Sequence, residues 1–243
     1  MPLHFLLDEP VASSVGDDVV LTGAEAHHAA TVRRVRVGEE VTVGDGHGAW
    51  LTGSCVSVAP REVVVRVTGR VDAPPPTPRL VLVQALAKGD RDELAVQAAA
   101  ELGVDEIVPW QAARSVSRWD AGKAEKGRAR WAAIVREAAK QSHRAWLPSV
   151  SALATTKDLA ARAAASRVLV LEPTGSTRVA ALELTGDEDV VLVVGPEGGI
   201  APEELAALEA AGATLVRLGD TVLRTSTAGP AALAVVSVAL GRW

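Results

Sequence analysis

Five consecutive apolar residues at positions 190–194 are followed by the turn Gly195-Pro196-Glu197-Gly198-Gly199 and then by Pro202-Glu203-Glu204. An uninterrupted apolar run of this length is typical of a strand that is covered on both faces. Proline and two carboxylates are typical of the first turn of a helix, where proline costs no hydrogen bond and acidic groups face the positive dipole end. The segment therefore predicts an α/β fold with a glycine-rich turn at the carboxyl end of a strand. Ligands often bind at such turns, although an ordinary tight connection would have the same pattern.

A proline-rich stretch at 73–78 separates two patterns of secondary structure. Before it, short predicted strands form what we expect to be a small β-barrel, with residues 44–48 as a hairpin turn; these strands are 19–21, 40–43, 50–58 and 62–67. After it, predicted strands at 80–86, 106–108, 168–171, 190–194 and 214–218 alternate with predicted helices at 90–102, 122–144, 157–165, 202–211 and 227–240. Such alternation is typical of a mostly parallel sheet covered by helices. The sequence thus predicts two domains, 1–72 and 79–243, joined by a stiff linker.

Composition excludes several classes of protein. Of the 243 residues 48% are hydrophobic, which is ample for a packed core. Cys55 is the only cysteine, so an intramolecular disulfide and a multi-cysteine zinc site are excluded, and we expect no metal. No apolar run approaches the roughly 20 residues that span a bilayer. We therefore expect a cytoplasmic protein that does not enter the membrane.

Basic side chains are concentrated in one part of an acidic chain. The net charge is −5, yet residues 114–144 contain nine Arg and Lys side chains against three acidic ones. A local patch of this kind can bind phosphate groups, although a solvated helix face would have the same charge. Four tryptophans could stack on bases, but packing in the core is the preferred interpretation; they are Trp110, Trp119, Trp131 and Trp146.

Common ligand-binding and catalytic motifs are absent from this sequence. Neither a Rossmann fingerprint nor a Walker-type phosphate loop is present, and no serine has the glycine-flanked setting of a hydrolase nucleophile. Three loops remain, each at the end of a predicted strand: residues 171–175, 195–199 and 218–225. If their strands are neighbours in one sheet, the three loops converge on one crevice.

The residues of these loops occur together in one known family. The matching elements are the turn at 195–199 with Pro202-Glu203-Glu204, then Leu218-Gly219, Val222-Leu223-Arg224-Thr225 and Thr227-Ala228 before an alanine-rich segment. Further matches follow in order along nearly the whole chain: His28, Val32-Arg33-Arg34, Gly38, Lys88-Gly89, Gln97, Glu101-Leu102-Gly103-Val104, Pro109, Arg114-Ser115, Gln141, Arg144 and Pro148. On these residues the chain resembles the bacterial 16S ribosomal RNA (uracil-N3)-methyltransferases of the SPOUT superfamily.

The resemblance implies a fold and a reaction. The fold would be a PUA-like β-barrel followed by a SPOUT α/β domain with a deep trefoil knot, which general topology rules advise against predicting. The reaction would be methylation of N3 of a specific uridine in 16S ribosomal RNA of the small subunit, with S-adenosyl-L-methionine as cofactor. A homodimer is also implied, with each cofactor site near the subunit interface.

The resemblance also assigns candidate site residues. Cofactor binding is expected at Leu171, Glu172, Pro173, Gly195, Pro196, Glu197, Gly198, Ile200, Leu218, Leu223 and Thr225. Arg224 is the expected catalytic or substrate-orienting residue, because a guanidinium can bind phosphate or stabilise a uracil anion. A structural salt bridge is the alternative for Arg224. RNA contacts are expected at His28, Arg34, Arg114, Gln141 and Arg144.

One position departs from the family. Relatives commonly have glutamate after the Arg-Thr pair, whereas this chain has Ser226, which is a candidate helix N-cap. The group that accepts the N3 proton is therefore unassigned. Two alternatives stay open: another knotted RNA methyltransferase that modifies a ribose 2′-hydroxyl, and a non-catalytic RNA-binding or assembly factor.

Overall fold

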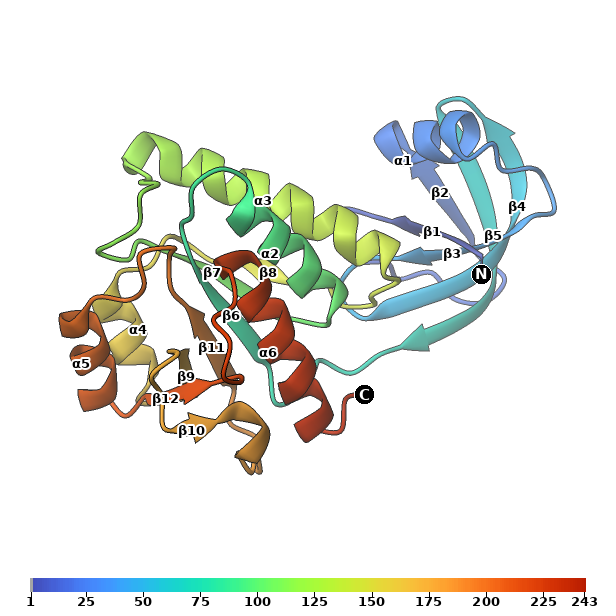
Figure 1. The fold of residues 1–243 in the computed structure, drawn as a ribbon. Helices are drawn as coiled ribbons and strands as arrows, with labels where there is room; N and C mark the ends of the chain where they lie inside the picture. Colours follow the sequence, from blue (N-terminus) through green and yellow to red (C-terminus); the bar gives the residue numbers. More distant parts are fainter. Residues whose placement is uncertain (1) are drawn as a thin grey trace. The chain divides into compact units, whose positions relative to one another are not determined.

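The computed structural model describes residues 2–243, which divide into two compact units (Figure 1). Unit 1 contains residues 2–75 together with 139–147, and unit 2 contains 76–138 and 148–243. The division falls between Pro75 and Pro76, inside the proline-rich stretch. Residues 139–147 had been assigned by sequence to the second domain, but they fold with the first.

Unit 1 is built on a five-stranded sheet in the order β1-β3-β4-β5-β2. Its strands are β1 (Leu3–Leu6), β2 (Asp18–Thr22), β3 (Glu40–Gly44), β4 (Ala49–Ala59) and β5 (Glu62–Asp72). β1 runs parallel to β3, and the other pairs are antiparallel. The predicted hairpin is confirmed, since residues 45–48 connect the paired strands β3 and β4. Sequence reasoning missed β1, which lies at one edge of the sheet.

The sheet of unit 1 is curled but open, so the prediction of a β-barrel is corrected. Among the described residues no pairing joins the edge strands β1 and β2. Two register shifts bend β4, one at Thr52/Gly53 and one at Cys55/Ser57, and such bulges increase the local twist. Helix α1 (Gly23–His27) and the π-helical turn η1 (His28–Val32) contribute Ala26 and Ala29 to the core beneath the sheet.

The segment 139–147 is joined to unit 1 by backbone bonds and a nearly buried ion pair. The backbone N–H of Leu147 donates to the Gly46 carbonyl at 2.9 Å, and that of Gly48 donates to the Ala145 carbonyl at 3.0 Å. The Lys140 ammonium contacts both Glu25 carboxylate oxygens, at 2.6 and 2.8 Å. The Lys140 and Glu25 side chains are only 8% and 17% exposed, so both charges have lost most of their hydration, and the attraction between them offsets that loss.

Replacing Lys140 by methionine is expected to destabilise the protein by about 3 kcal/mol, because the Glu25 carboxylate would remain partly buried without its cation. The measurement is the free energy of unfolding from urea titration. Lys126→Met is the matched control, since Lys126 is an exposed lysine of the same helix, α3 (Ala121–Gln141), and its change should stay within about 0.5 kcal/mol. Equal losses in the two variants would contradict the prediction.

Unit 2 contains a seven-stranded sheet in the order β10-β12-β9-β11-β6-β7-β8, in which every pair is parallel. Its strands are β6 (Leu80–Ala85), β7 (Glu106–Trp110), β8 (Ser149–Val150), β9 (Arg167–Leu171), β10 (Thr177–Arg178), β11 (Val190–Val194) and β12 (Thr214–Arg217). β6 and β11 are buried at every position, as the uninterrupted apolar run predicted for β11. The prediction of a mostly parallel sheet is confirmed.

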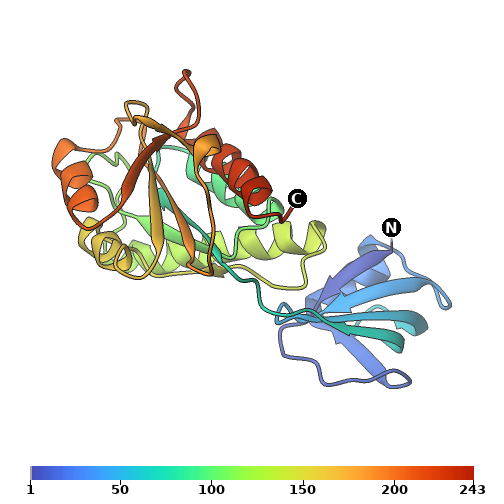
Figure 2. The ribbon, with the colours of Figure 1, turned by 90° about the horizontal axis from the view of Figure 1, so that it is seen from below.

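Helices cover both faces of this sheet (Figure 2). Helices α2 (Arg91–Glu101) and α6 (Thr225–Ala239) pack against each other and against β6, and α6 also contacts β11. On the other face, α4 (Thr156–Arg162) and α5 (Pro202–Ala210) contribute Leu159 and Leu208 to the core formed with β6, β9 and β11. A short 3-10 turn, η2 (Val179–Ala181), follows β10.

The tryptophans serve mainly in packing, as expected. Trp110 is fully buried and Trp131 is 1% exposed. Trp119 meets the ring of Trp131 edge to face at a centroid distance of 5.3 Å, while the Trp146 indole N–H donates to the Ala73 carbonyl.

Within residues 2–243 no helix combines the length and apolar character needed to cross a membrane. Over the same range, no cluster of histidine, cysteine and acidic side chains is suited to a metal ion.

Candidate functional site

The three loops singled out by sequence follow strands that are consecutive in the sheet of unit 2. The loops begin after β9, β11 and β12, and the observed order of these strands is β12-β9-β11. Because parallel strands present their carboxyl ends at one edge, the loops meet there. They enclose a cavity of about 400 Å³, within the range of roughly 300–1,000 Å³ that is usual for small-molecule sites.

Most of the predicted cofactor-binding residues line this cavity. Those present are Leu171, Glu172, Pro173, Gly195, Pro196, Glu197, Ile200, Leu218, Leu223 and Thr225, together with Arg224. Gly198 is not in the lining. Its carbonyl instead accepts a hydrogen bond from the Arg114 guanidinium at 3.2 Å, so this residue faces the neighbouring loop between β7 and α3.

A buried hydrogen-bond chain fixes the second loop to the start of α6. The Thr225 hydroxyl donates to the Gly195 carbonyl at 2.8 Å and accepts from the Gln84 amide at 2.9 Å. Gln84 is fully buried at the carboxyl end of β6, and its Nε2 also donates to the Ala85 carbonyl. The Gln84 carbonyl oxygen has no partner among the described residues. These hydrogen bonds therefore connect β6, the glycine turn and α6 through the single hydroxyl group of Thr225.

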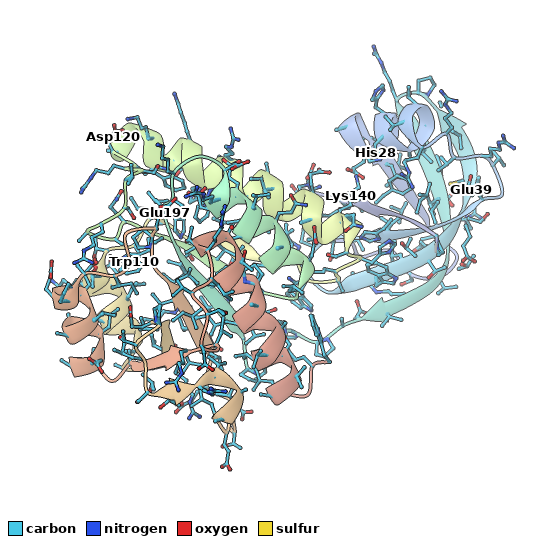
Figure 3. All side chains as sticks on the ribbon, in the orientation of Figure 1. His28, Glu39, Trp110, Asp120, Lys140 and Glu197 are labelled. Carbon is cyan, nitrogen blue, oxygen red and sulfur yellow. The ribbon has the colours of Figure 1, made fainter. Side chains whose placement is uncertain are left out.

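Glu197 lies among the loops at this edge (Figure 3), where its carboxylate is engaged by the protein itself. The Lys88 backbone N–H and the Arg91 guanidinium both donate to Oε1 at 3.0 Å. Burial opposes ionisation, but the backbone N–H groups of Glu197 and Lys88 and the Arg91 charge outweigh it, so the pKa of Glu197 lies below its usual value. Glu197 thus ties the glycine turn to the loop between β6 and α2.

The buried Glu204 carboxylate holds the glycine turn from the other side. At 6% exposure it accepts hydrogen bonds from the Ala113 N–H at 3.0 Å and from the Thr156 hydroxyl at 2.7 Å. Its second oxygen accepts from the Ala201 N–H at 3.3 Å, which caps α5. The loop that carries Arg114 is therefore fixed to the helix that follows the glycine turn.

Arg224 lines the cavity from the third loop and is exposed. Within residues 2–243 its guanidinium has no hydrogen-bond or ion-pair partner, so the alternative of a structural salt bridge is not found. By contrast, Arg217 donates to the Ser176 carbonyl at 3.1 Å, and Arg178 pairs with Asp220 at 3.0 Å. These two arginines hold the first and third loops together, whereas the Arg224 guanidinium is available to a ligand.

Arg224 is also the N-cap residue of α6, so the expectation that Ser226 caps this helix is wrong. The helix begins at Thr225, one residue before Ser226, because the Thr225 side chain is fixed in the buried hydrogen-bond chain with Gln84 and Gly195.

Glu172 is the remaining acid of the cavity wall, and its Oε1 accepts from the Thr174 N–H at 3.3 Å and hydroxyl at 3.1 Å.

The predicted RNA-binding residues fall in both units. Arg114 belongs to unit 2, whereas His28, Arg34, Gln141 and Arg144 belong to unit 1. The His28 Nδ1 lies 3.3 Å from the Lys140 ammonium, inside the cluster that holds segment 139–147. Arg34 is exposed after η1 and has a left-handed backbone with φ 55°, which is uncommon for a residue with a side chain. Gln141 is exposed and Arg144 is half-buried.

Among the residues of this region that sequence reasoning missed are Gln84 and Arg91. Arg91 lines the cavity, and Gln84 supports it from beneath. The rule that grouped the three loops also applies to the loop after β6, because β6 is the neighbour of β11 and its carboxyl end lies at the same edge. Reading that loop with the others would have found Arg91, whereas Gln84 was hidden inside an apolar strand.

Comparisons with known proteins agree with this architecture. The family described as RNA methyltransferase domain matches residues 74–237, and the RNA methyltransferase PUA domain matches 21–67. Among curated proteins, the ribosomal RNA small subunit methyltransferase E of Mycobacterium bovis is 47% identical, covering 94% of this chain and 89% of that protein. The protein of the same name from Bacillus subtilis is 30% identical, with coverages of 89% and 88%.

A solved structure is similar over almost the whole chain. It is a ribosomal RNA small subunit methyltransferase E from Neisseria gonorrhoeae bound to S-adenosyl methionine, with 28% identity and a TM-score of 0.85. The alignment covers 98% of each chain. The two units and their order are therefore shared with a protein that binds this cofactor.

Proposed function

Because this chain belongs to the RNA methyltransferase family, we propose that it transfers a methyl group from S-adenosyl-L-methionine to N3 of one uridine in the 16S RNA of the small ribosomal subunit. The observation that carries the proposal is the convergence of three loops on one cavity. Relatives that are similar over most of the chain are named as small-subunit RNA methyltransferases, and one of them binds this cofactor. The choice of uridine N3 rests on the motif resemblance.

The chemistry of the cavity suits the cofactor. Apolar walls from Leu171, Ile200 and Leu218 would hold the adenosyl part, and backbone groups of the glycine turn are accessible for hydrogen bonds to adenine. The cofactor carries no phosphate, in agreement with a turn that lacks a phosphate-binding motif. When bound, it supplies a methyl group activated by an adjacent sulfonium. Together, the size of the cavity and its donor groups favour S-adenosylmethionine over a dinucleotide.

Arg224 would act on the RNA base. Attack by N3 requires loss of its proton, and the negative charge that develops spreads over the uracil oxygens. A guanidinium beside the cavity stabilises this charge and holds the base in line with the methyl group. Arginine stays protonated, so it is not the proton acceptor. Because Ser226 replaces the acid found in relatives, water or another group near the substrate would accept the N3 proton.

The proposal includes the knot and the homodimer implied by the resemblance, and a cytoplasmic location. Support for the knot comes from chain connectivity: β12 lies near one side of the sheet, yet the helix that follows it packs against β6 and β11 in the middle. The chain between them, residues 218–224, shares the cavity with the other two loops. Support for a dimer comes from exposed apolar side chains on α6 and the preceding loop, Val238 at 63% and Val222 at 77%.

The deciding experiment is methyl transfer from labelled S-adenosylmethionine to small subunits, and to their naked RNA, from a strain that lacks this gene. We expect incorporation of label, followed by recovery of 3-methyluridine on nucleoside mass spectrometry. Subunits from the parent strain are the control and should accept no label, because their site is already methylated. A ribose-methylated nucleoside would favour the 2′-hydroxyl alternative, and no incorporation would favour a non-catalytic factor.

Adding a methyl group at Gly195 is expected to weaken cofactor binding. A Cβ there would lie 2.6 Å from Cγ1 of the buried Ile200, so the turn and the cavity wall must move apart. We expect Gly195→Ala to lower the affinity for S-adenosylmethionine by about tenfold. Overpacking of this kind costs on the order of 1.4 kcal/mol, which corresponds to a factor of ten in the dissociation constant. The measurement is calorimetry with the cofactor.

Gly198→Ala is the matched control for this variant, since the added Cβ would make an ordinary contact of 3.5 Å with the Arg114 side chain. It should bind the cofactor as the unmodified protein does. The same loss of affinity in both variants would mean that the turn tolerates no side chain at all, and the role assigned to the Ile200 contact would be rejected.

A further inference from the structure

Two arginines from different loops are anchored to consecutive residues of the glycine turn. Arg91, at the start of α2, donates from Nη1 to the Glu197 carboxylate at 3.0 Å. Arg114, in the loop after β7, donates from Nη1 to the Gly198 carbonyl at 3.2 Å. Consecutive Cα atoms are about 3.8 Å apart, so the two anchors are immediate neighbours. Strands β6 and β7 are adjacent in the sheet, which brings both loops to the edge of the cavity.

Both guanidiniums keep most of their donors free for a ligand. Each has five N–H groups, and within residues 2–243 each side chain makes only the one anchoring contact. Arg114 is exposed and the Arg91 side chain is 42% exposed, so both are accessible to solvent. The Lys88 N–H also binds Glu197, which keeps that carboxylate in place when Arg91 contacts a further anion. The anchors thus fix the positions of the two guanidiniums and leave most of their N–H groups available to a ligand.

The resemblance already implies an RNA contact for Arg114; from this arrangement we infer that Arg91 acts with it, and that the two bind the phosphate backbone of the substrate RNA at the rim of the cavity. The inference rests on the proposed function and adds to it the groups that hold the strand beside the target nucleotide. A base that enters the cavity leaves its phosphates at the rim, where Arg91 belongs to the lining and Arg114 lies outside it. Arginine matches phosphate geometry with paired N–H groups, and phosphate contacts fix the register of a bound strand.

The placement favours an RNA strand over the cofactor as the ligand of this pair. Arg91 lines the cavity, but Arg114 lies outside its lining. A ligand that contacts both must therefore extend beyond the cavity, as a nucleic-acid backbone does and a cofactor inside the cavity does not. Both arginines are anchored to the glycine turn, so the turn that lines the cavity also positions the two charges.

The test measures binding of naked small-subunit ribosomal RNA, with saturating S-adenosylmethionine, as a function of salt concentration. Arg91→Gln and Arg114→Gln should each weaken binding by about tenfold, as expected for loss of a charge-assisted hydrogen bond. Each should also reduce the slope of log affinity against log salt by about 0.7, the value for one contact to single-stranded nucleic acid. Arg91→Lys keeps the charge and should retain the slope while losing part of the affinity.

Arg79→Gln is the matched control. The Arg79 side chain is 41% exposed and also pairs with a glutamate, Glu106, but it lies at the amino end of β6, away from the loops that form the cavity. It should leave both affinity and slope unchanged. Calorimetry with the cofactor alone should give the affinity of the unmodified protein in Arg114→Gln and Arg79→Gln, because neither side chain lines the cavity.

The inference is overturned if the Arg91 and Arg114 variants keep the slope of the unmodified protein, or if Arg114→Gln loses cofactor affinity instead of RNA affinity. Neither result would affect the proposed function, which depends on methyl transfer by the unmodified enzyme. If the unmodified protein binds RNA with the expected salt dependence but transfers no methyl group, the proposed function fails and the phosphate contacts stand.

Discussion

Arg224→Gln is expected to lower kcat for RNA methylation by about a hundredfold, the usual effect of removing one donor that stabilises charge in a transition state. The guanidinium lines the cavity and has no partner among the described residues, so its charge is available to the substrate. Cofactor affinity should change less than kcat, because the apolar walls of the cavity come from other side chains, Leu171, Ile200 and Leu218. The measurement is kcat at saturating RNA, alongside calorimetry with S-adenosylmethionine.

Arg61→Gln is the control for Arg224→Gln. Arg61 is likewise exposed and unpaired within residues 2–243, but it lies in the turn between β4 and β5 of unit 1. This variant removes the same charge and should keep kcat close to that of the unmodified enzyme. If Arg224→Gln retains full kcat, or if its main effect is a lower free energy of unfolding, Arg224 has no role in the reaction.

Thr225→Val should reduce both cofactor affinity and stability. Valine has nearly the shape of threonine but neither donates to Gly195 nor accepts from Gln84. The fully buried Gln84 amide would lose one of its two hydrogen bonds, and the Gly195 carbonyl would lose its donor. We expect the free energy of unfolding to fall by about 2 kcal/mol, the cost of leaving buried polar groups unpaired. With the glycine turn released, cofactor affinity should fall by about tenfold or more.

Thr227→Val makes the same chemical change two residues further along α6, at an exposed position. Its effect on stability should stay within about 0.5 kcal/mol, and its cofactor affinity should be unaltered. A Thr225→Val protein that unfolds earlier but binds the cofactor normally would show that the hydrogen-bond chain supports the fold and not the site.

The sequence predicted the local elements of unit 2 well, because each depends on short-range physics. An apolar run predicted β11, and proline with two carboxylates predicted the start of α5. The boundaries of the long basic helix differed from those expected. α3 ends at Gln141, and His143, inside the predicted helix 122–144, has a left-handed φ of 55° that is incompatible with a helix. Two-residue strands such as β8 and β10 are too short to leave a periodic pattern.

The prediction that the three loops meet at one edge of the sheet is confirmed, whereas the contacts between side chains in this region were not predicted. Strand order brought the three loops together, as the convergence argument required. Glu197 was predicted to bind cofactor, yet its carboxylate is engaged by Lys88 and Arg91, which lie more than a hundred positions earlier in the chain. No local pattern links residues at such separation, so sequence alone could not identify these contacts.

Local sequence patterns were enough to identify the kind of protein. They indicated two parts, of which the second alternates buried strands with helices and has glycine, proline and arginine at the strand ends. These features arise from backbone conformation and local burial, which neighbouring residues dictate. Three features could be found only in the folded chain: segment 139–147 folds with unit 1, the sheet of unit 1 stays open, and Gly198 faces Arg114 instead of the cavity. Each of these depends on which distant surfaces meet, and that is settled by packing of the whole chain.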